Sequence, residues 1–213
     1  MTAVSNRATP LCIVCGVTRR YELKKRAERQ EETRRRIVEA TVELHKAVGP
    51  ARTTISAIAT RAGVERKTFY RHFPDPDAIL EACSAHYRAL NPPPDPHEWL
   101  TIDDPHERLR RALVDAYGYY RQNEQMMANV LRDRALGVPD GDGFLRHRAL
   151  AKRTLAEPFA VRGRQRRRLD AALELALDFH AWQTLAHAGL TDRHAAELTA
   201  ALIEAALPTR TPR

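Results

Sequence analysis

Six side chains that can donate hydrogen bonds lie close together between residues 66 and 72 of the chain. They are Arg66, Lys67, Thr68, Tyr70, Arg71 and His72. Guanidinium, ammonium, hydroxyl and imidazole groups in such a cluster donate to phosphate oxygens, or to the acceptor edge of guanine in the major groove of duplex DNA. The alternative interpretation is a solvated helix surface without a partner, and the surrounding elements must decide between the two.

Two cysteines near the N-terminus, Cys12 and Cys15, have the spacing of half a zinc site or of a redox pair. The third cysteine, Cys83, is distant, and no second Cys-x-x-Cys motif follows. No strand-helix unit surrounds the pair, as a thioredoxin-like site would require. We therefore expect no bound metal, no cofactor and no disulfide framework.

Motifs of known enzyme classes are missing from the chain. It has nine histidines, but no two of them lie three or four residues apart, and no glutamate is followed by a histidine three residues later. This excludes the helical ligand spacings of zinc proteases and of di-iron bundles. Nucleophile-elbow, phosphate-loop and dinucleotide fingerprints are also missing. We predict that the protein is not an enzyme.

The positive charge of the chain is concentrated at its N-terminus. Residues 1–36 hold ten Lys or Arg and four Glu, which accounts for +6 of the formal net charge of +8. Such a segment attracts phosphate groups, although a solvated helical arm without a partner has the same pattern. We expect residues 1–33 to form a basic arm, with residues 1–20 as a disordered extension.

The composition indicates an all-helical protein. Hydrophobic residues make up 43% of the chain and aromatic residues 6%, with Ala, Leu, Arg and Glu abundant, and these residue types favour helix. Val, Ile and Thr form no alternating run that would predict a strand. No apolar stretch approaches the roughly 20 residues that span a bilayer. A secretory leader pattern is also missing, so the expected location is cytoplasmic.

Two short helices are predicted around the donor cluster, supported by longer ones. Four helices are expected in the first 90 residues, over 21–48, 54–62, 65–72 and 77–90. Gly49-Pro50 ends the first, because glycine accepts a left-handed cap and proline cannot continue the hydrogen-bond ladder. Gly63 supplies the tight turn between the two short helices. Phe69 and Phe73 then point inward, which turns the donors outward.

The clearest boundary in the chain is Asn91-Pro92-Pro93-Pro94-Asp95-Pro96. Three consecutive prolines exclude helix and favour stiff polyproline II. We therefore divide the chain into the arm (1–33), a helix-turn-helix domain (34–90) and a second helical domain (91–213). Further helices are expected over 105–123, 124–136, 144–160, 164–188 and 192–207.

An ordered set of motifs over about fifty residues resembles the DNA-binding domain of the TetR family of transcriptional regulators. The motifs are Ile37-x-x-Ala40, Thr53-Thr54-Ile55-x-x-Ile58-Ala59, Ala62-Gly63-Val64 and Thr68-Phe69-Tyr70-Arg71-His72-Phe73-Pro74. The resemblance implies a three-helix DNA-binding domain followed by a helical bundle for ligand binding and dimerisation. It also implies a regulator, most simply a repressor, that binds a palindromic operator in duplex DNA.

The resemblance also implies roles for individual residues. Positions that match Thr54 and Ser56 contact backbone or bases in the family, and those that match Tyr70 and His72 usually contact phosphate. Arg66, Lys67 and Arg71 match positions that select or clamp the site, and Lys67 replaces a residue that is often small. Pro76 stands where the family commonly has a phosphate-binding lysine. We expect the basic arm to compensate for that loss, especially through Arg34, Arg35 and Arg36.

The resemblance further implies a homodimer formed through the last two helices. Candidate seam residues are Leu198, Leu202 and Ala205, with Leu173, Ala176, Leu177, His180 and Thr184. The alternative for each of them is the core of a single protomer.

A small-molecule effector, implied by the family, would bind between the helices of the second domain. Candidate lining residues are Tyr117, Tyr120, Met126, Met127, Phe144, Phe159, Phe179, His180 and Trp182. Aromatic and Met residues at helical spacing are more often core than pocket. His180 stands out because a polar group among aromatic rings needs a partner. The alternative regulator responds to no ligand, or responds to a partner protein.

Overall fold

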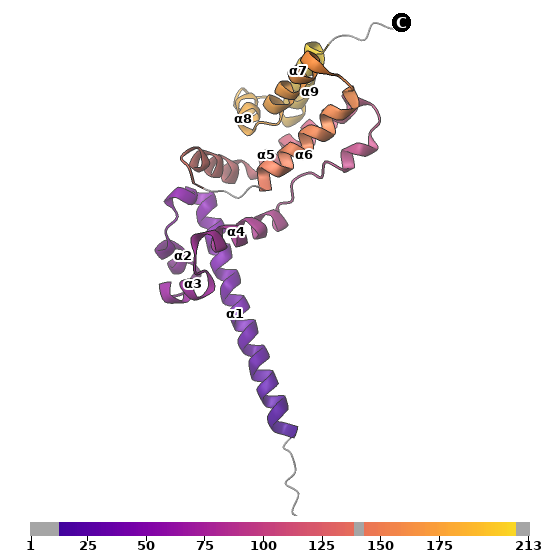
Figure 1. Cartoon of the computed structure of the whole chain (residues 1–213). Helices are drawn as coiled ribbons and strands as arrows, with labels where there is room; N and C mark the ends of the chain where they lie inside the picture. The colour runs from indigo at the N-terminus through magenta and orange to yellow at the C-terminus, as the bar shows by residue number, and fades with distance from the viewer. Residues whose placement is uncertain (1–12, 139–142, 208–213) are drawn as a thin grey trace, which may run out of the picture.

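The computed structural model describes residues 13–138 and 143–207 (Figure 1). Its α-helices are α1 (Ile13–Val48), α2 (Ile55–Ala62), α3 (Arg66–His72), α4 (Pro76–Leu90), α5 (Pro105–Ala135), α6 (Gly143–Ala156), α7 (Gly163–Ala176), α8 (Phe179–His187) and α9 (Asp192–Ala206). Single 3-10 turns follow α1, precede α5 and follow α6. The described residues form no strand, which confirms the all-helical fold class. None of the described helices is long and apolar enough to cross a membrane.

The second half of α1 packs with α2, α3 and α4 around a small hydrophobic cluster. Its most buried side chains include Ile37, Phe69 and Phe73, each with 1% of its surface exposed or less. Gly63 ends α2 with φ = 63°, a left-handed conformation that glycine adopts without strain. The predicted pair of short helices joined by a glycine turn is therefore confirmed.

The first half of α1 extends away from the rest of the protein (Figure 1). The helix begins at Ile13, eight residues before the predicted start, so the backbone of residues 13–20 is helical rather than irregular. Residues 21–32 are all exposed. Burial begins at the turn where apolar residues start to recur, since Ile37 and Val38 are the first residues of α1 in the core. Residues 1–12, including Cys12, lie outside the described residues.

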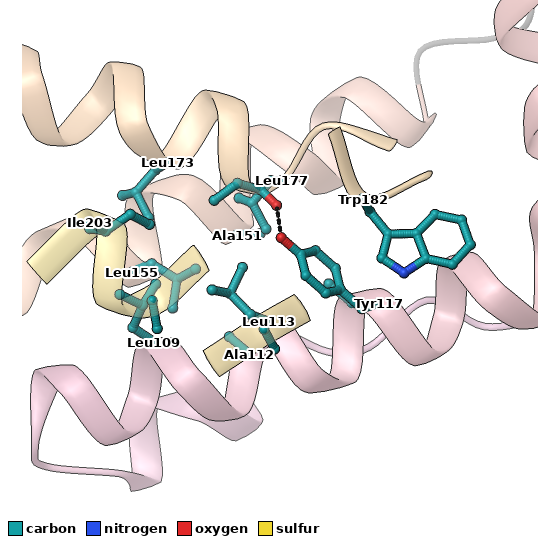
Figure 2. Close-up of a cluster of buried hydrophobic side chains, with 14 of the residues drawn as sticks. Leu109, Ala112, Leu113, Tyr117, Ala151, Leu155, Leu173, Leu177, Trp182 and Ile203 are labelled. Carbon is teal, nitrogen blue, oxygen red and sulfur yellow. Dashed lines mark hydrogen bonds between the residues drawn. The ribbon is translucent and has the colours of Figure 1, made fainter. Parts of the chain in front are cut away.

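A second, larger cluster is formed by α5 to α9. Leu109, Leu113 and Leu173 have no exposed surface, and Leu155 and Leu169 have 1%. Figure 2 shows how side chains of α5, α6, α7 and α9 meet in this cluster. At the surface, Glu174 of α7 pairs with Arg148 and Lys152 of α6, which ties these two helices together.

Two helix divisions in the second half of the chain also differ from the prediction. The segments 105–123 and 124–136 form one continuous helix, α5, rather than two. The predicted long helix 164–188 is broken after Ala176, because the Asp178 carboxylate accepts hydrogen bonds from the backbone N–H groups of His180 and Ala181 and starts α8. An internal Asp that caps a helix cannot be distinguished from an exposed helical Asp by periodicity alone.

The proline segment 91–95 contains no helix, and His147 of α6 contacts it through a 2.7 Å hydrogen bond between its Nε2 and the Pro94 carbonyl oxygen. The two clusters also meet directly, because α1 packs against α5. A movement of one hydrophobic cluster can therefore be passed to the other through the contacts of α1 and α4 with α5.

Candidate nucleic-acid interface

The outer face of α3 carries the predicted donors. Arg66, Lys67, Tyr70 and Arg71 are exposed, Tyr70 at 44%, whereas Phe69 on the inner face has 1% exposed surface. Arg66, Lys67 and Arg71 form no ion pair with other residues of the described segments. Their charges are therefore available to an external anion.

The beginning of α2 contributes two further exposed hydroxyl groups, those of Thr54 and Ser56. The Thr54 hydroxyl oxygen accepts a hydrogen bond of 3.1 Å from the N–H of Ala57 and so caps the helix. A hydroxyl that accepts a capping bond still has its own hydrogen to donate. Thr54 can therefore hold α2 and bind a phosphate at the same time.

Thr68 and His72 lie on the flank of α3 and are only partly exposed. The Nε2 atom of His72 is buried and has no hydrogen-bond partner in the described part of the chain. Burial, together with the positive charges of Arg71 and Arg34, lowers the pKa of His72. One ring nitrogen of His72 therefore lacks a hydrogen-bond partner among the described residues.

The arginines at the base of the arm differ in their surroundings. Arg34 points toward α3, where its guanidinium lies 4.3 Å from the centre of the Phe73 ring and Nη1 donates to the His72 carbonyl oxygen at 3.3 Å. Arg35 points away and pairs with Glu32 and Glu39 on the exposed side of α1. Arg34 thus holds the arm against the end of α3, whereas Arg35 stabilises the arm itself.

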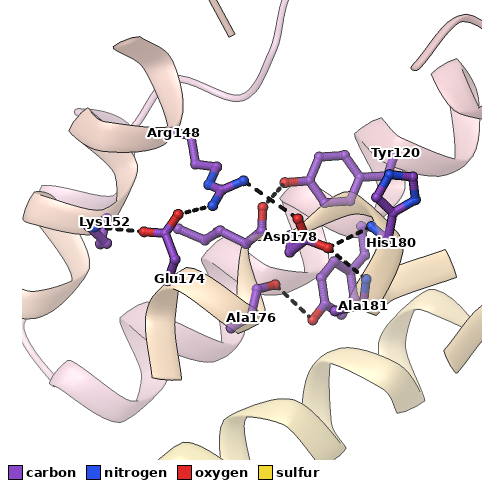
Figure 3. A network of polar contacts seen from close by, with 10 residues as sticks. Tyr120, Arg148, Lys152, Glu174, Ala176, Asp178, His180 and Ala181 are labelled. Atoms are coloured by element: carbon purple, nitrogen blue, oxygen red, sulfur yellow. Dashed lines mark hydrogen bonds and ion pairs between the residues drawn. The ribbon is translucent and has the colours of Figure 1, made fainter. Parts of the chain in front are cut away.

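Four of the nine predicted effector-lining residues belong to the closed core. Tyr117, Tyr120, Phe179 and Trp182 have at most 5% of their surface exposed. Three of them carry a polar atom, and each of these atoms has a hydrogen-bond partner. Tyr117 donates to the Ala176 carbonyl oxygen, and Tyr120 donates to that of Leu177 (Figure 3). Trp182 Nε1 donates to Asp192. His180, by contrast, is exposed. Packing within the protomer therefore explains the burial of the four aromatic residues, and no ligand is needed to explain it.

A cavity of about 140 Å³ lies instead between α1, α4, α5 and α6. It includes three predicted residues, Met126, Met127 and Phe144. Sequence reasoning missed the remainder of its lining: Val42, His45, Pro50, Leu80, Cys83, Ser84, Tyr87, Arg88, Pro93, Tyr119, Val130, Leu131, Gly143 and His147. No local pattern marks these residues, because they come from helices far apart in the chain.

The lining of this cavity is mostly apolar and its titratable groups are mostly neutral. Burial lowers the pKa of His45 to about 4 and raises that of the Cys83 thiol to about 11. Burial also raises the pKa of Tyr87 to about 12, and its hydroxyl donates to Asn123 Oδ1 at 2.5 Å. Arg88 brings a positive charge to the cavity wall. The cavity suits a small apolar molecule that also carries an acceptor.

Three polar residues near the end of α5, Asn129, Arg132 and Asp133, form a latch onto the end of α1. Asn129 Nδ2 donates to the Lys46 carbonyl oxygen at 2.8 Å, and Arg132 Nη2 donates to that of Val48 at 3.1 Å. Helix ends leave such carbonyls without intrahelical partners, so the latch supplies them from another element.

Asp133 is the buried member of the latch, with 1% of its side chain exposed. Its carboxylate accepts from Arg132 Nε at 2.7 Å and from the backbone N–H of Ala51 at 2.8 Å. The hydrogen bond from Arg132, followed by that from Ala51, lowers the pKa of Asp133. Sequence reasoning missed the latch entirely.

The predicted dimer seam is only partly exposed. Leu173, Ala176 and Leu177 have at most 2% of their surface exposed because they pack inside their own protomer, so their assignment to the seam is wrong. On α9, Leu198 is 43% and Leu202 63% exposed. Ala205 is also exposed, one turn further along the same face.

No group of three or more metal-ligating side chains occurs in the part of the chain that the structure describes. Cys83 is buried and free. The Cys12–Cys15 motif lies at the border of the described residues, so its interpretation stays a prediction.

Comparison with known proteins identifies the N-terminal helices. The family model described as bacterial regulatory proteins, tetR family, matches residues 37–83. The HTH-type transcriptional regulator SrpR of Pseudomonas putida is 36% identical over 96 residues, which are 44% of this chain and 43% of SrpR. The uncharacterized HTH-type transcriptional regulator TtgW, also of Pseudomonas putida, is 35% identical over 96 residues, 44% of this chain and 69% of TtgW. The alignment thus spans less than half of SrpR.

Solved structures share most of the fold at low sequence identity. A TetR-like transcriptional regulator from Rhodococcus sp. RHA1 is 19% identical, with a TM-score of 0.53 over 81% of this chain and 93% of that one. A putative fatty acid metabolism regulator of Clostridium perfringens is 17% identical, with a TM-score of 0.54 over 82% of this chain and 100% of that one. The chain belongs to the TetR family of DNA-binding transcriptional regulators.

Proposed function

We propose that this protein is a homodimeric repressor that binds a palindromic operator and leaves it when a small apolar effector occupies the cavity between α1, α4, α5 and α6. The observation that carries the proposal is the outer face of α3. It exposes Arg66, Lys67, Tyr70 and Arg71 over a backbone fixed by buried Phe69. A rigid helix with an outward row of donors can enter the major groove and contact base edges.

We assign the sequence-predicted residues to two roles. Arg66 and Lys67, at the first turn of α3, contact base edges, since the start of a recognition helix lies deepest in the groove. The phosphate contacts of α2 and α3 come from Thr54, Ser56, Thr68, Tyr70, Arg71 and His72. The predicted DNA contacts of Arg34 and Arg35, at the base of the arm, stay predictions. Such a protein acts on the chromosome, so we expect it in the cytoplasm.

Dimerisation supports this role because one short recognition helix reads too few bases for useful specificity. The exposed α9 face with Leu198, Leu202 and Ala205 is the surface that we assign to the second copy. Two recognition helices would then lie about 34–36 Å apart, one turn of duplex. We expect Leu202→Glu to yield monomers in sedimentation equilibrium with an unchanged helical spectrum.

An effector in the cavity would act on the contacts that hold the helix-turn-helix domain against the second domain. The cavity walls come from α1 and α4 on one side and from α5 and α6 on the other. A ligand that prefers one separation of these walls shifts the population toward that separation. Apolar walls with the positive charge of Arg88 favour a small ring compound with one or two acceptor atoms.

The DNA-binding test uses a duplex selected by the wild-type chain from a random pool, labelled and titrated by fluorescence anisotropy. We expect Arg66→Ala and Lys67→Ala each to weaken binding by roughly 10- to 100-fold, the value of a good base contact. Arg111→Ala is the matched control, because Arg111 is an exposed arginine of α5 that pairs with Asp115. Equal losses for all three variants, or equal affinity for a scrambled duplex, would contradict sequence recognition through α3.

The effector test measures thermal stability with a panel of monocyclic phenols and carboxylates. We expect at least one member to raise the melting temperature and to release the selected duplex. Val130→Trp fills the cavity from α5 and should abolish both effects. A regulator that is stable, binds DNA and responds to no member of the panel would instead favour control by a partner protein.

A further inference from the structure

A polar groove of about 280 Å³ lies between the helical arm and the end of the recognition helix. Its walls are Arg26, Arg29, Gln30 and Thr33 of α1 and Arg71 and His72 of α3. We propose that this arm groove holds one phosphodiester strand of the operator, so that α1 and α3 clamp the DNA backbone between them. The inference rests on the proposed function, since it adds a second contact to the same DNA complex.

The four arm residues of the groove lie on one face of α1. Positions 26, 29, 30 and 33 follow the spacing i, i+3, i+4 and i+7, which places them above one another on a helix. Arg34 fixes the direction of this face, because its guanidinium lies on the Phe73 ring and donates to the His72 carbonyl oxygen. The arm is therefore held beside the end of α3.

The charges of the arm are sorted between its two faces. On the face away from the groove, Lys24 pairs with Glu28 at 3.9 Å and Arg35 pairs with Glu32. In the groove, Arg26 and Arg29 form no ion pair with residues of the described segments. Glu22 lies on the groove face one turn before Arg26, but it forms no ion pair with the described residues either. Glu31 is the acidic group of the arm that acts on His72 of the groove. With Arg26, Arg29 and Arg71 in its walls, the groove still carries a net positive charge.

The position of the groove fits the path of a DNA strand. A recognition helix in the major groove, about 12 Å wide, has a phosphate strand along each edge. Arg71 and His72, at the end of α3, lie where such a strand passes, and the buried Nε2 atom of His72 lacks a partner in the described residues. A phosphate oxygen in the groove can accept hydrogen bonds from the exposed guanidinium of Arg71.

The length of the arm allows more than one contact. From Ile13 to Arg34 the helix is about 32 Å long, nearly one turn of duplex. A polar helix without a packed face gains little from tertiary contacts, so an external partner is what would stabilise it. The DNA backbone supplies that partner along the groove face.

The test compares two single variants that each remove one exposed positive charge from neighbouring turns of the arm. Arg26→Ala removes a groove charge, and Lys24→Ala removes a charge from the opposite face. Alanine keeps the arm helical, which circular dichroism checks. Affinity for the selected duplex is measured between roughly 50 and 200 mM salt, where log K falls with log salt by about 0.9 for each phosphate contact.

We expect Arg26→Ala to make the salt slope shallower by about 0.9 for each bound protomer, and Arg26→Ala/Arg29→Ala by about 1.8. Ethylation of some of the phosphates that block wild-type binding should no longer matter for the double variant. Ethylation of the phosphates that Thr54, Ser56 and Tyr70 contact should still block it. Lys24→Ala should keep the wild-type slope and the wild-type interference positions.

The outcomes separate this inference from the proposed function. If Arg26→Ala behaves like the wild type, or if Lys24→Ala causes the same loss, the groove is not a backbone site and the arm attracts DNA only through its overall charge. If the wild-type chain selects no duplex from the pool, the proposed function fails and the inference fails with it.

Discussion

Replacing Asp133 by alanine removes the acceptor that joins the end of α5 to the turn after α1. In the structure, the carboxylate accepts from the N–H of Ala51 at 2.8 Å and from Arg132 Nε at 2.7 Å, with 1% of its side chain exposed. The alanine variant leaves the Ala51 N–H without that acceptor and Arg132 without its counter-charge. Both effects destabilise the junction between the two hydrophobic clusters.

The two hydrogen bonds contribute unequally to the expected loss. A hydrogen bond from a backbone N–H to a charged acceptor stabilises by about 1.5–3 kcal/mol. The Arg132 side chain is 43% exposed, so solvent screening reduces its ion pair to at most about 1 kcal/mol. We therefore expect Asp133→Ala to lower the free energy of unfolding by about 2–3 kcal/mol. Asp133→Asn retains an acceptor for Ala51 and should lose only about 1 kcal/mol.

Urea unfolding followed by far-ultraviolet circular dichroism measures the loss, and amide hydrogen exchange at Ala51 locates it. The control is Glu43→Ala, which removes an exposed ion pair between α1 and Arg61 of α2 and should lose less than about 1 kcal/mol. A loss for Asp133→Ala no larger than that for Glu43→Ala would refute the reasoning. So would a larger loss for asparagine than for alanine.

Two further predictions concern single hydrogen bonds, and a third concerns the dependence of stability on pH. Tyr120→Phe removes the bond to the Leu177 carbonyl oxygen and should lower the free energy of unfolding by about 1 kcal/mol, measured by urea denaturation. Thr54→Ala removes the cap on the Ala57 N–H and should cost about 1 kcal/mol, seen as a lower melting temperature with α2 frayed in hydrogen exchange. The pKa of Asp133 is lowered in the folded state. The ionised carboxylate therefore stabilises the fold at any pH above its pKa in the unfolded chain, about 3.9. This stabilisation is lost as the pH falls toward the pKa of Asp133 in the folded state. The stability difference between the wild type and Asp133→Ala should therefore shrink on acidification below that pH, which urea titrations across the acid range measure.

The helix-turn-helix could be predicted because its determinants are local. Gly63 takes the left-handed conformation that its position after α2 requires, and Thr54 caps the helix that it precedes. Phe69 lies in the core as its spacing predicts. Each feature depends on residues within one or two turns, and local patterns are what a single sequence contains.

The second half of the chain was harder to predict because long-range packing decides its boundaries. Nothing near Asn123 distinguishes a helix end from a helix interior; its side chain bonds to the Tyr119 carbonyl oxygen and to Tyr87 of α4, so α5 continues through it. Tyr120 and Trp182 are aromatic residues that the sequence suggests as ligand contacts. In the fold, their polar atoms donate hydrogen bonds to other residues of the protein. The cavity combines α1, α4, α5 and α6, an arrangement that no local spacing encodes.

The cavity, the latch and the bond between Tyr87 and Asn123 all lie on one seam, where α1 and α4 meet α5. The latch holds the end of α1, and the tyrosine bond holds the middle of α4. We propose that an effector entering the cavity changes the separation of α4 and α5 while the latch keeps the end of α1 in place. The helix-turn-helix domain would then rotate about the latch and would stay in contact with the second hydrophobic cluster. On this account, weakening the tyrosine bond with Tyr87→Phe should change how strongly an effector releases DNA, whereas weakening the latch should lower stability first.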